Sequence, residues 1–125
     1  MDTKNLKFTT KDSGKRYTEE SGFQRDTQAG KPRFWLLYPK GIPYADQPLT
    51  RVAELLSRGA EKYDSRNWEQ ADSETALERA KESAMRHLTQ ACCGEEDEDH
   101  FAAVVFNCIF AMTLEYKRRC VHEKG

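Results

Sequence analysis

From about residue 48 to residue 119, the apolar residues of this chain recur every three or four positions, and two short polar breaks divide the pattern. This period places apolar side chains on one face of a helix, whereas strands alternate every second residue. The pattern predicts helices over about 48–63, 73–93 and 98–119. Pro48 suits a first helical turn, and Gly94 is a good stop signal. The predicted fold class is therefore all-α.

Each predicted helix carries an apolar stripe, and the stripe of the third helix is wide. The stripes consist of Leu49, Val52, Leu56, Gly59, Ala60 and Tyr63 in the first helix; of Leu77, Ala80, Ala84, Leu88 and Ala91 in the second; and of Phe101, Val104, Val105, Cys108, Met112 and Tyr116 in the third. A chain of 125 residues forms only a modest core. A small core with a wide apolar third helix predicts that copies of the chain associate.

The first part of the chain, residues 1–47, holds most of the glycines and prolines. Because these residues break regular structure, the segment is predicted to be an extended N-terminal arm. Several aromatic residues punctuate the arm, so it is not a low-complexity segment. The predicted organisation is an arm over 1–47 and a helical core over 48–125, which together make one structural domain.

Charge and hydropathy exclude several classes of function. The formal net charge is −1, with 33% charged residues, so the chain lacks the basic excess of a general nucleic-acid binder. It has no apolar run long enough to span a membrane. The first residues are not followed by the apolar core of a signal peptide. A cytoplasmic protein is predicted, which means the host cytoplasm if the chain is viral.

Residues 94–100, Gly-Glu-Glu-Asp-Glu-Asp-His, form an acidic elbow between the second and third predicted helices. Like charges in a short turn repel one another, and a hard divalent cation with oxygen ligands would neutralise them. Carboxylates that hold metal ions between helices serve in catalysis at phosphate groups. The alternative is a solvated acidic turn that caps a helix, which is the commoner state of an acidic run taken alone.

Polar residues also flank the apolar stripes of the second and third helices. Glu78 and Glu82 are four residues apart and share a face, Arg86 continues this row, and His87 is close to it. On the third helix, His100 and Asn107 are seven residues apart and share a face. At the contact between two helices such polar groups need partners, and a bound metal ion and phosphate would provide them. The alternative for the two glutamates is surface pairing with neighbouring basic residues.

A further set of residues has the chemistry needed to hold a nucleotide. Phosphate-binding candidates are Arg25, Lys31, Arg33, Arg58, Lys62 and Arg86, and base-binding candidates are Asn67, Trp68 and Asn107. Arginine presents paired donors to phosphate oxygens, and lysine acts as a mobile point charge. Each basic residue taken alone is more often a surface charge. For Trp68, a hydrophobic plug beneath its loop is the more frequent role. No Walker-type loop is present.

Three groups of residues resemble the phage dATP/dGTP diphosphohydrolases, a MazG-like family of MazZ type. The first group comprises residues 22–27, 30–33 and 36–37; the second comprises 58–63 and 66–69; the third comprises 86–88, 94–95, 100, 107 and 114–116. The pieces Gly-Ala-x-Lys-Tyr and Arg-Asn-Trp in the second group are fairly specific together. The resemblance covers roughly residues 20–118.

The resemblance implies a MazG-like helical core that assembles as a homodimer or homotetramer. It implies hydrolysis of a purine deoxynucleoside triphosphate, dGTP especially and possibly dATP, to the monophosphate and pyrophosphate, in phage purine deoxynucleotide metabolism. Two or more Mg²⁺ or Mn²⁺ ions would be held by helical carboxylates. In the wider superfamily these are glutamates on one helix, followed by Glu-x-x-Asp on the next. Glu78 and Glu82 resemble the first part, and both 95–98 and 96–99 resemble the second.

The resemblance thus implies Glu82 as the leading metal ligand, followed by Glu78, Glu95, Glu98 and Asp99, with Glu82, Glu78 and Glu98 as catalytic carboxylates. It leaves open whether His100 touches metal, phosphate or only protein, and His87 is a further polar candidate. Two other functions remain as alternatives. One is a non-catalytic helical interaction module whose acidic elbow binds a basic partner. The other is an enzyme that cuts the β–γ bond.

Overall fold

The computed structural model describes the backbone of residues 9–124 and the side chains of residues 9–121. Residues 1–8 of the predicted arm lie outside this range. The chain divides into two compact units, one that ends at Leu36 and one that begins at Leu37. The second unit contains the long helices, and the first contains a short β-hairpin.

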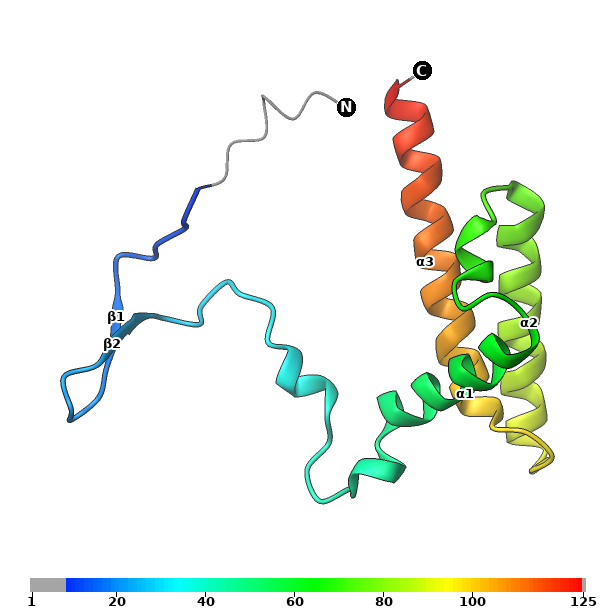
Figure 1. Cartoon of the computed structure of the whole chain (residues 1–125), viewed down its shortest axis with the longest axis horizontal. Helices are drawn as coiled ribbons and strands as arrows, with labels where there is room; N and C mark the ends of the chain where they lie inside the picture. The colour runs from blue at the N-terminus through cyan, green and yellow to red at the C-terminus, as the bar shows by residue number, and fades with distance from the viewer. Residues whose placement is uncertain (1–8, 125) are drawn as a thin grey trace. The chain divides into compact units, whose positions relative to one another are not determined.

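The helical unit consists of α1 (Pro48–Lys62), α2 (Glu74–Cys92) and α3 (His100–Lys124), shown in Figure 1. The three predicted helices are therefore confirmed, and most of their ends lie within two residues of the predicted ones. The exception is α3, which continues beyond the predicted end at 119 because residues 120–124 include no glycine or proline. Pro48 occupies the first turn of α1, as predicted.

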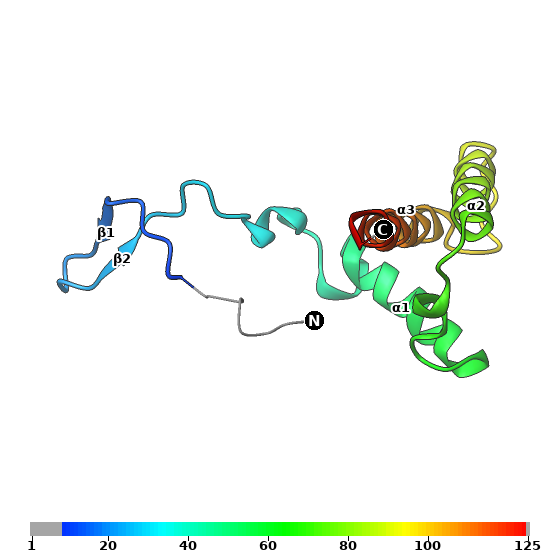
Figure 2. The ribbon, with the colours of Figure 1, turned by 90° about the horizontal axis from the view of Figure 1, so that it is seen from above.

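Helix α2 packs along α3, and α1 also packs against α3 (Figures 1 and 2). Small side chains take part of the core, since Ala80 of α2 and Ala102 and Ala103 of α3 are all buried. Alanine lets two helix backbones approach closely. Val52 of α1 and Leu114 of α3 complete the buried apolar set, and Leu114 is 0% exposed.

The buried faces of α2 and α3 differ from the predicted apolar stripes. On α2, His87 takes a buried position and Leu88 is 45% exposed. On α3, Asn107 is buried, whereas Phe101 and Met112 are 56% and 65% exposed. Small and polar side chains therefore take buried positions that the larger apolar residues of α3 do not. The predicted stripe of α3 is thus largely a surface of the single chain rather than part of its core.

The connection between α1 and α2 contains a 3-10 helix, Asn67–Gln70. Its Trp68 packs edge-on against Phe106 and Phe110 of α3, with ring centroids 5.5 and 5.7 Å apart. Trp68 is half-buried by these contacts. These contacts are the ones expected of a hydrophobic plug beneath the loop.

Lys117 of α3 also contacts the connection between α1 and α2. Its Nζ donates to the backbone carbonyl oxygens of Glu69 and, at 2.8 Å, of Ala71. Immediately afterwards, Ser73 caps α2 by accepting a hydrogen bond from the backbone N–H of Ala76 at 3.0 Å. Lys117 thus pairs one carbonyl in the 3-10 helix and one just after it, and Ser73 pairs one of the first amides of α2.

The first unit contains an antiparallel hairpin of β1 (Arg16–Thr18) and β2 (Gln24–Asp26), in which Arg16 pairs with Asp26 and Thr18 with Gln24. Gly22, with φ +92°, makes the turn in a conformation that L side chains rarely adopt. The sequence pattern predicts an extended arm here and does not reveal this hairpin. Strands of three residues are too short to show an alternating pattern.

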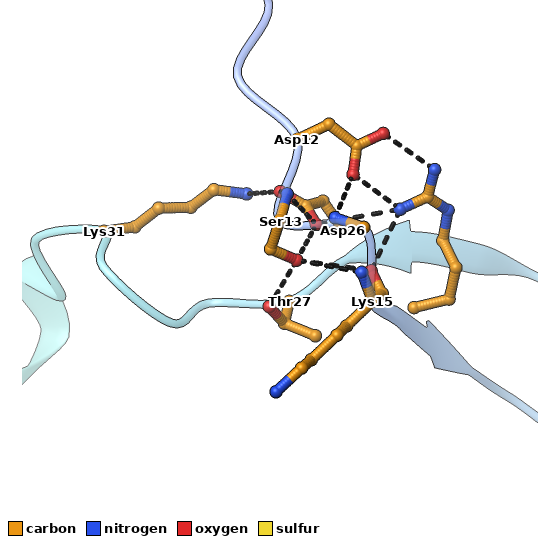
Figure 3. Close-up of polar contacts among 8 residues, drawn as sticks. Asp12, Ser13, Lys15, Asp26, Thr27 and Lys31 are labelled. Carbon is orange, nitrogen blue, oxygen red and sulfur yellow. Dashed lines mark hydrogen bonds and ion pairs between the residues drawn. The ribbon is translucent and has the colours of Figure 1, made fainter.

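Asp26 is the centre of the polar contacts that close the hairpin (Figure 3). Its carboxylate accepts from the Ser13 hydroxyl at 2.5 Å and from the Ser13 backbone N–H at 3.1 Å, and it pairs with Lys31 at 3.2 Å. The Ser13 hydrogen bond lowers the pKa of Asp26 well below its usual range. These contacts fasten the segments before and after the hairpin to its second strand.

Candidate functional site

The acidic elbow begins with a well-formed helix end. Gly94 follows the last turn of α2 with φ +79°. Its N–H donates to the carbonyl of Ala91, and the N–H of Glu95 donates to that of Gln90. This pair of hydrogen bonds is a Schellman motif, which satisfies carbonyls at a helix end and needs glycine at the left-handed position. Gly94 thereby turns the chain away from α2 as predicted.

The elbow ends at Asp99, which caps α3. Its Oδ1 accepts from the N–H of Ala102 at 3.1 Å. Arg51 of α1 grips the same carboxylate with two donors, Nε to Oδ2 at 2.8 Å and Nη2 to Oδ1 at 2.6 Å. This hydrogen-bonded pair lowers the pKa of Asp99 and raises that of Arg51. Arg51 therefore fixes the start of α3 against α1.

Three side chains of the elbow come together as a potential ion-binding group. Glu95, Asp97 and His100 each offer one ligand atom, and these atoms lie within 4.8 Å of one another. The two carboxylates are exposed, whereas His100 is 3% exposed. The Nε2 atom of His100 lies 2.8 Å from Oδ1 of Asp97, and this hydrogen bond lowers the pKa of Asp97. The elbow thus combines solvent-accessible negative charge with one fixed, buried imidazole.

His87 provides a second buried imidazole, next to that of His100. Nδ1 of His87 lies 2.9 Å from Nδ1 of His100, and their ring centroids are 5.1 Å apart. Burial lowers the pKa of His87, and the charge of the neighbouring Arg86 lowers it further. His87 is therefore held in its neutral form at neutral pH. The predicted polar candidates His87 and His100 are brought together in the structure.

The other predicted carboxylates do not belong to this ion-binding group. Glu78 and Glu82 are exposed on α2, and Glu78 pairs with Lys81 at 3.2 Å. Neither glutamate belongs to the group of Glu95, Asp97 and His100. Glu98 is exposed within the elbow, and Asp99 is engaged by Arg51. The structure therefore does not gather the α2 pair with the elbow within one chain.

The predicted basic residues are divided between the two units. Arg58, Lys62 and Arg86 are exposed in the helical unit, and Arg25, Lys31 and Arg33 are exposed in the hairpin unit. The charge of Arg58 reaches the elbow, because it contributes to the lowered pKa of Asp99. Nη2 of Arg86 lies 3.5 Å from Nε2 of His87. Lys31 is paired with Asp26 inside its own unit (Figure 3).

The predicted base-binding residues have different environments. Asn67 is exposed at the start of its 3-10 helix. Asn107 is 9% exposed, and its amide donates to the carbonyl of Ala103 at 2.8 Å and to the Ser83 hydroxyl at 3.2 Å. Of the two amides, Asn67 is therefore the accessible one.

Two residues of the site were not singled out by the sequence analysis. Asp97 lay within the acidic run, but it was not assigned a role there. Its place three residues before His100, within the same short turn, is the available signal. Arg51 gave no local signal, because its partner Asp99 is 48 residues away in the sequence.

The Arg51–Asp99 pair leads to a stability prediction. Asp99→Ala removes both the cap of α3 and the ion pair, and we expect the free energy of unfolding to fall by about 1–2 kcal/mol. Asp99→Asn keeps a capping oxygen and loses only the charge, so about half of that loss or less is expected. Urea denaturation followed by circular dichroism measures both. Equal losses for the two variants would show that the cap contributes nothing.

The arrangement defines a class of protein: a small helical protein with a candidate divalent-metal group at the turn between two packed helices. Residues 21–124 match the family model described as dATP/dGTP diphosphohydrolase, N-terminal. The chain belongs to this family, which confirms the resemblance found in the sequence and makes it a member of a hydrolase family that acts on nucleotides. No curated protein and no solved structure matches the chain. Within residues 9–124, no helix has the length and apolar character needed to cross a membrane.

Proposed function

We propose that the protein is a metal-dependent pyrophosphohydrolase that converts dGTP, and possibly dATP, to the monophosphate and pyrophosphate. The observation that carries this proposal is the group of Glu95, Asp97 and His100 in a member of the dATP/dGTP diphosphohydrolase family. The substrate class, the α–β cleavage and a role in phage purine deoxynucleotide metabolism, acting in the host cytoplasm, follow from the family resemblance.

The donor set of the elbow fits a divalent ion of the kind that the family resemblance implies. Two carboxylate oxygens suit Mg²⁺ and Mn²⁺, and the imidazole nitrogen shifts the preference towards Mn²⁺. When bound, such an ion neutralises phosphate charge and lowers the pKa of a water molecule. Glu95, Asp97 and His100 would hold one ion. A second ion would need further ligands, and Glu96 and Glu98 are the remaining exposed carboxylates of the elbow.

The chain's own residues would then orient the substrate. Arg58 and Arg86 are exposed on the helices next to the elbow and can pair with phosphate oxygens. We assign Lys62, and Arg25, Lys31 and Arg33 of the hairpin unit, to the same class of phosphate ligands. An exposed elbow carboxylate such as Glu98 can accept the proton of the attacking water. Asn67 offers an exposed amide for the edge of guanine.

Product analysis tests the proposed function. The protein is incubated with dGTP, dATP, dCTP, dTTP and GTP, with Mn²⁺ and separately with a chelator, and the products are separated by ion-exchange chromatography. Metal-dependent formation of dGMP and pyrophosphate is expected. Diphosphate with free phosphate would indicate β–γ cleavage instead. No turnover of any nucleotide at micromolar enzyme would reject the enzyme and favour the helical interaction module.

We further propose that the protein is a homodimer or homotetramer. Phe101, Val105, Ile109, Met112 and Tyr116 fall on one face of α3, and each is at least 38% exposed. An exposed apolar face of this length is typical of an interaction surface. Closed symmetric assemblies are the commonest way in which soluble proteins cover such a face.

A charge placed on this face should separate the copies. For Met112→Glu we expect a shift in mass, measured by light scattering after size exclusion, towards the 14.4 kDa of one chain. Thr75→Glu adds the same charge at an exposed position in the first turn of α2 and should leave the mass unchanged. A wild-type protein that already elutes as a monomer at micromolar concentration would contradict the assembly.

A further inference from the structure

The two buried histidines form one hydrogen-bonded pair, and only one end of it faces the elbow. His87 and His100 are 8% and 3% exposed, and their Nδ1 atoms lie 2.9 Å apart. At the elbow end, Nε2 of His100 lies 2.8 Å from Oδ1 of Asp97. At the other end, Nε2 of His87 lies 3.5 Å from Nη2 of Arg86.

These contacts fix the position of each proton in the neutral pair. The carboxylate of Asp97 only accepts, so Nε2 of His100 carries a hydrogen. The Nδ1 atom of neutral His100 must then accept from His87, so Nδ1 of His87 carries the second hydrogen. This leaves Nε2 of His87 as a lone-pair nitrogen facing the Arg86 guanidinium, which only donates. The donor and the acceptor of each hydrogen bond between Asp97 and Arg86 are thereby determined.

An ion at the elbow requires the opposite arrangement. A metal-binding nitrogen has to be free of hydrogen, and Nε2 is the nitrogen of His100 that faces Asp97. His100 must then carry its hydrogen on Nδ1 and donate it to Nδ1 of His87. His87 must in turn carry its own hydrogen on Nε2, and the exposed Arg86 guanidinium, which cannot accept it, must turn away from this nitrogen. The two arrangements contain the same number of hydrogens and differ only in tautomer.

We propose that His87 is a positioning residue for the ion-binding group, and that both histidines exchange tautomers together when an ion binds at the elbow. In this exchange His100 releases the hydrogen of Nε2 to water, the shared hydrogen passes from Nδ1 of His87 to Nδ1 of His100, and Nε2 of His87 takes one from water. The pair neither gains nor loses a proton. The inference rests on the proposed metal site. It gives His87 the role of orienting the His100 ring, which it contacts.

The affinity for Mn²⁺ alone, measured by the electron paramagnetic resonance of the free ion, tests the positioning role. His87→Phe keeps the ring volume but cannot accept from His100, and we expect about 10- to 100-fold weaker binding. His87→Asn places an amide near the position of Nδ1 that can donate or accept, and it should restore most of the affinity. Equal affinity of the wild-type protein and His87→Phe would overturn the role of His87 while leaving the metal site in place. No Mn²⁺ binding by the wild-type protein would reject the metal site itself.

A second measurement needs no variant and therefore does not depend on the folding of His87→Phe. Long-range ¹H–¹⁵N spectra of the wild-type protein identify which ring nitrogens carry hydrogen. Without metal, we expect hydrogen on Nε2 of His100 and on Nδ1 of His87. Saturation with diamagnetic Mg²⁺ should move them to Nδ1 of His100 and Nε2 of His87. Tautomers that stay unchanged while Mg²⁺ binds would overturn the exchange.

Discussion

Asp97→Asn is expected to lower the Mn²⁺-dependent hydrolysis of dGTP by roughly 100-fold or more. The substitution removes one negative ligand of the ion-binding group, and loss of several kcal/mol of charge stabilisation corresponds to at least this factor. Because the Asp97 side chain is 63% exposed, the helices should remain folded. The rate of pyrophosphate release at saturating dGTP, with circular dichroism as a check of folding, measures the effect.

Glu82→Gln is the matched control for this experiment. It removes one exposed carboxylate from α2 and makes no change in the group of Glu95, Asp97 and His100. If the elbow holds the ion alone, the rate should stay within a few-fold of the wild-type value. A large loss for Glu82→Gln together with an unaffected Asp97→Asn would place the metal on the α2 pair that the superfamily motif suggests.

Leu114→Ala is expected to reduce the free energy of unfolding by about 2–5 kcal/mol, the cost of a leucine-sized cavity in a packed core. Leu114 is 0% exposed, and few large side chains share the interior with it. A loss of this size is a large part of the stability of a small domain. Urea denaturation at one fixed protein concentration measures it, because association would otherwise change the apparent stability.

Val121→Ala serves as the control for Leu114→Ala. Val121 lies in the same helix and is 70% exposed, so its truncation should change the free energy of unfolding by less than about 0.5 kcal/mol. Similar losses for both variants would mean that Leu114 is not the centre of the core.

The sequence predicted the helices well because their signals are local. Pro48, Ser73 and Gly94 mark helix ends through contacts with residues no more than a few positions away. The faces that these helices bury were predicted less well. Which face of α3 turns inward depends on how the three helices pack, and Ala102 and Ala103 are buried there whereas Phe101 and Met112 are exposed.

The location of the candidate site is predictable from the sequence, but the contacts between its side chains are not. The acidic elbow stood out as a run of charge, and His87 and His100 were recognised as polar groups near the helix seam. Their contact depends on the turn at Gly94, which brings residues 13 positions apart to within hydrogen-bonding distance. The Arg51–Asp99 pair spans 48 positions and depends on the packing of α1 against α3, which no local pattern encodes.

The contact of Lys117 with the α1–α2 connection has a consequence for how this chain can vary among its relatives. The ammonium group reaches two carbonyls on either side of Gln70, while Trp68 inserts against the rings of Phe106 and Phe110. Adding or deleting one residue in this connection would move the two carbonyls away from Lys117. It would also move Trp68 away from the two phenylalanine rings. The length of this connection should therefore be constant in homologues that keep Lys117.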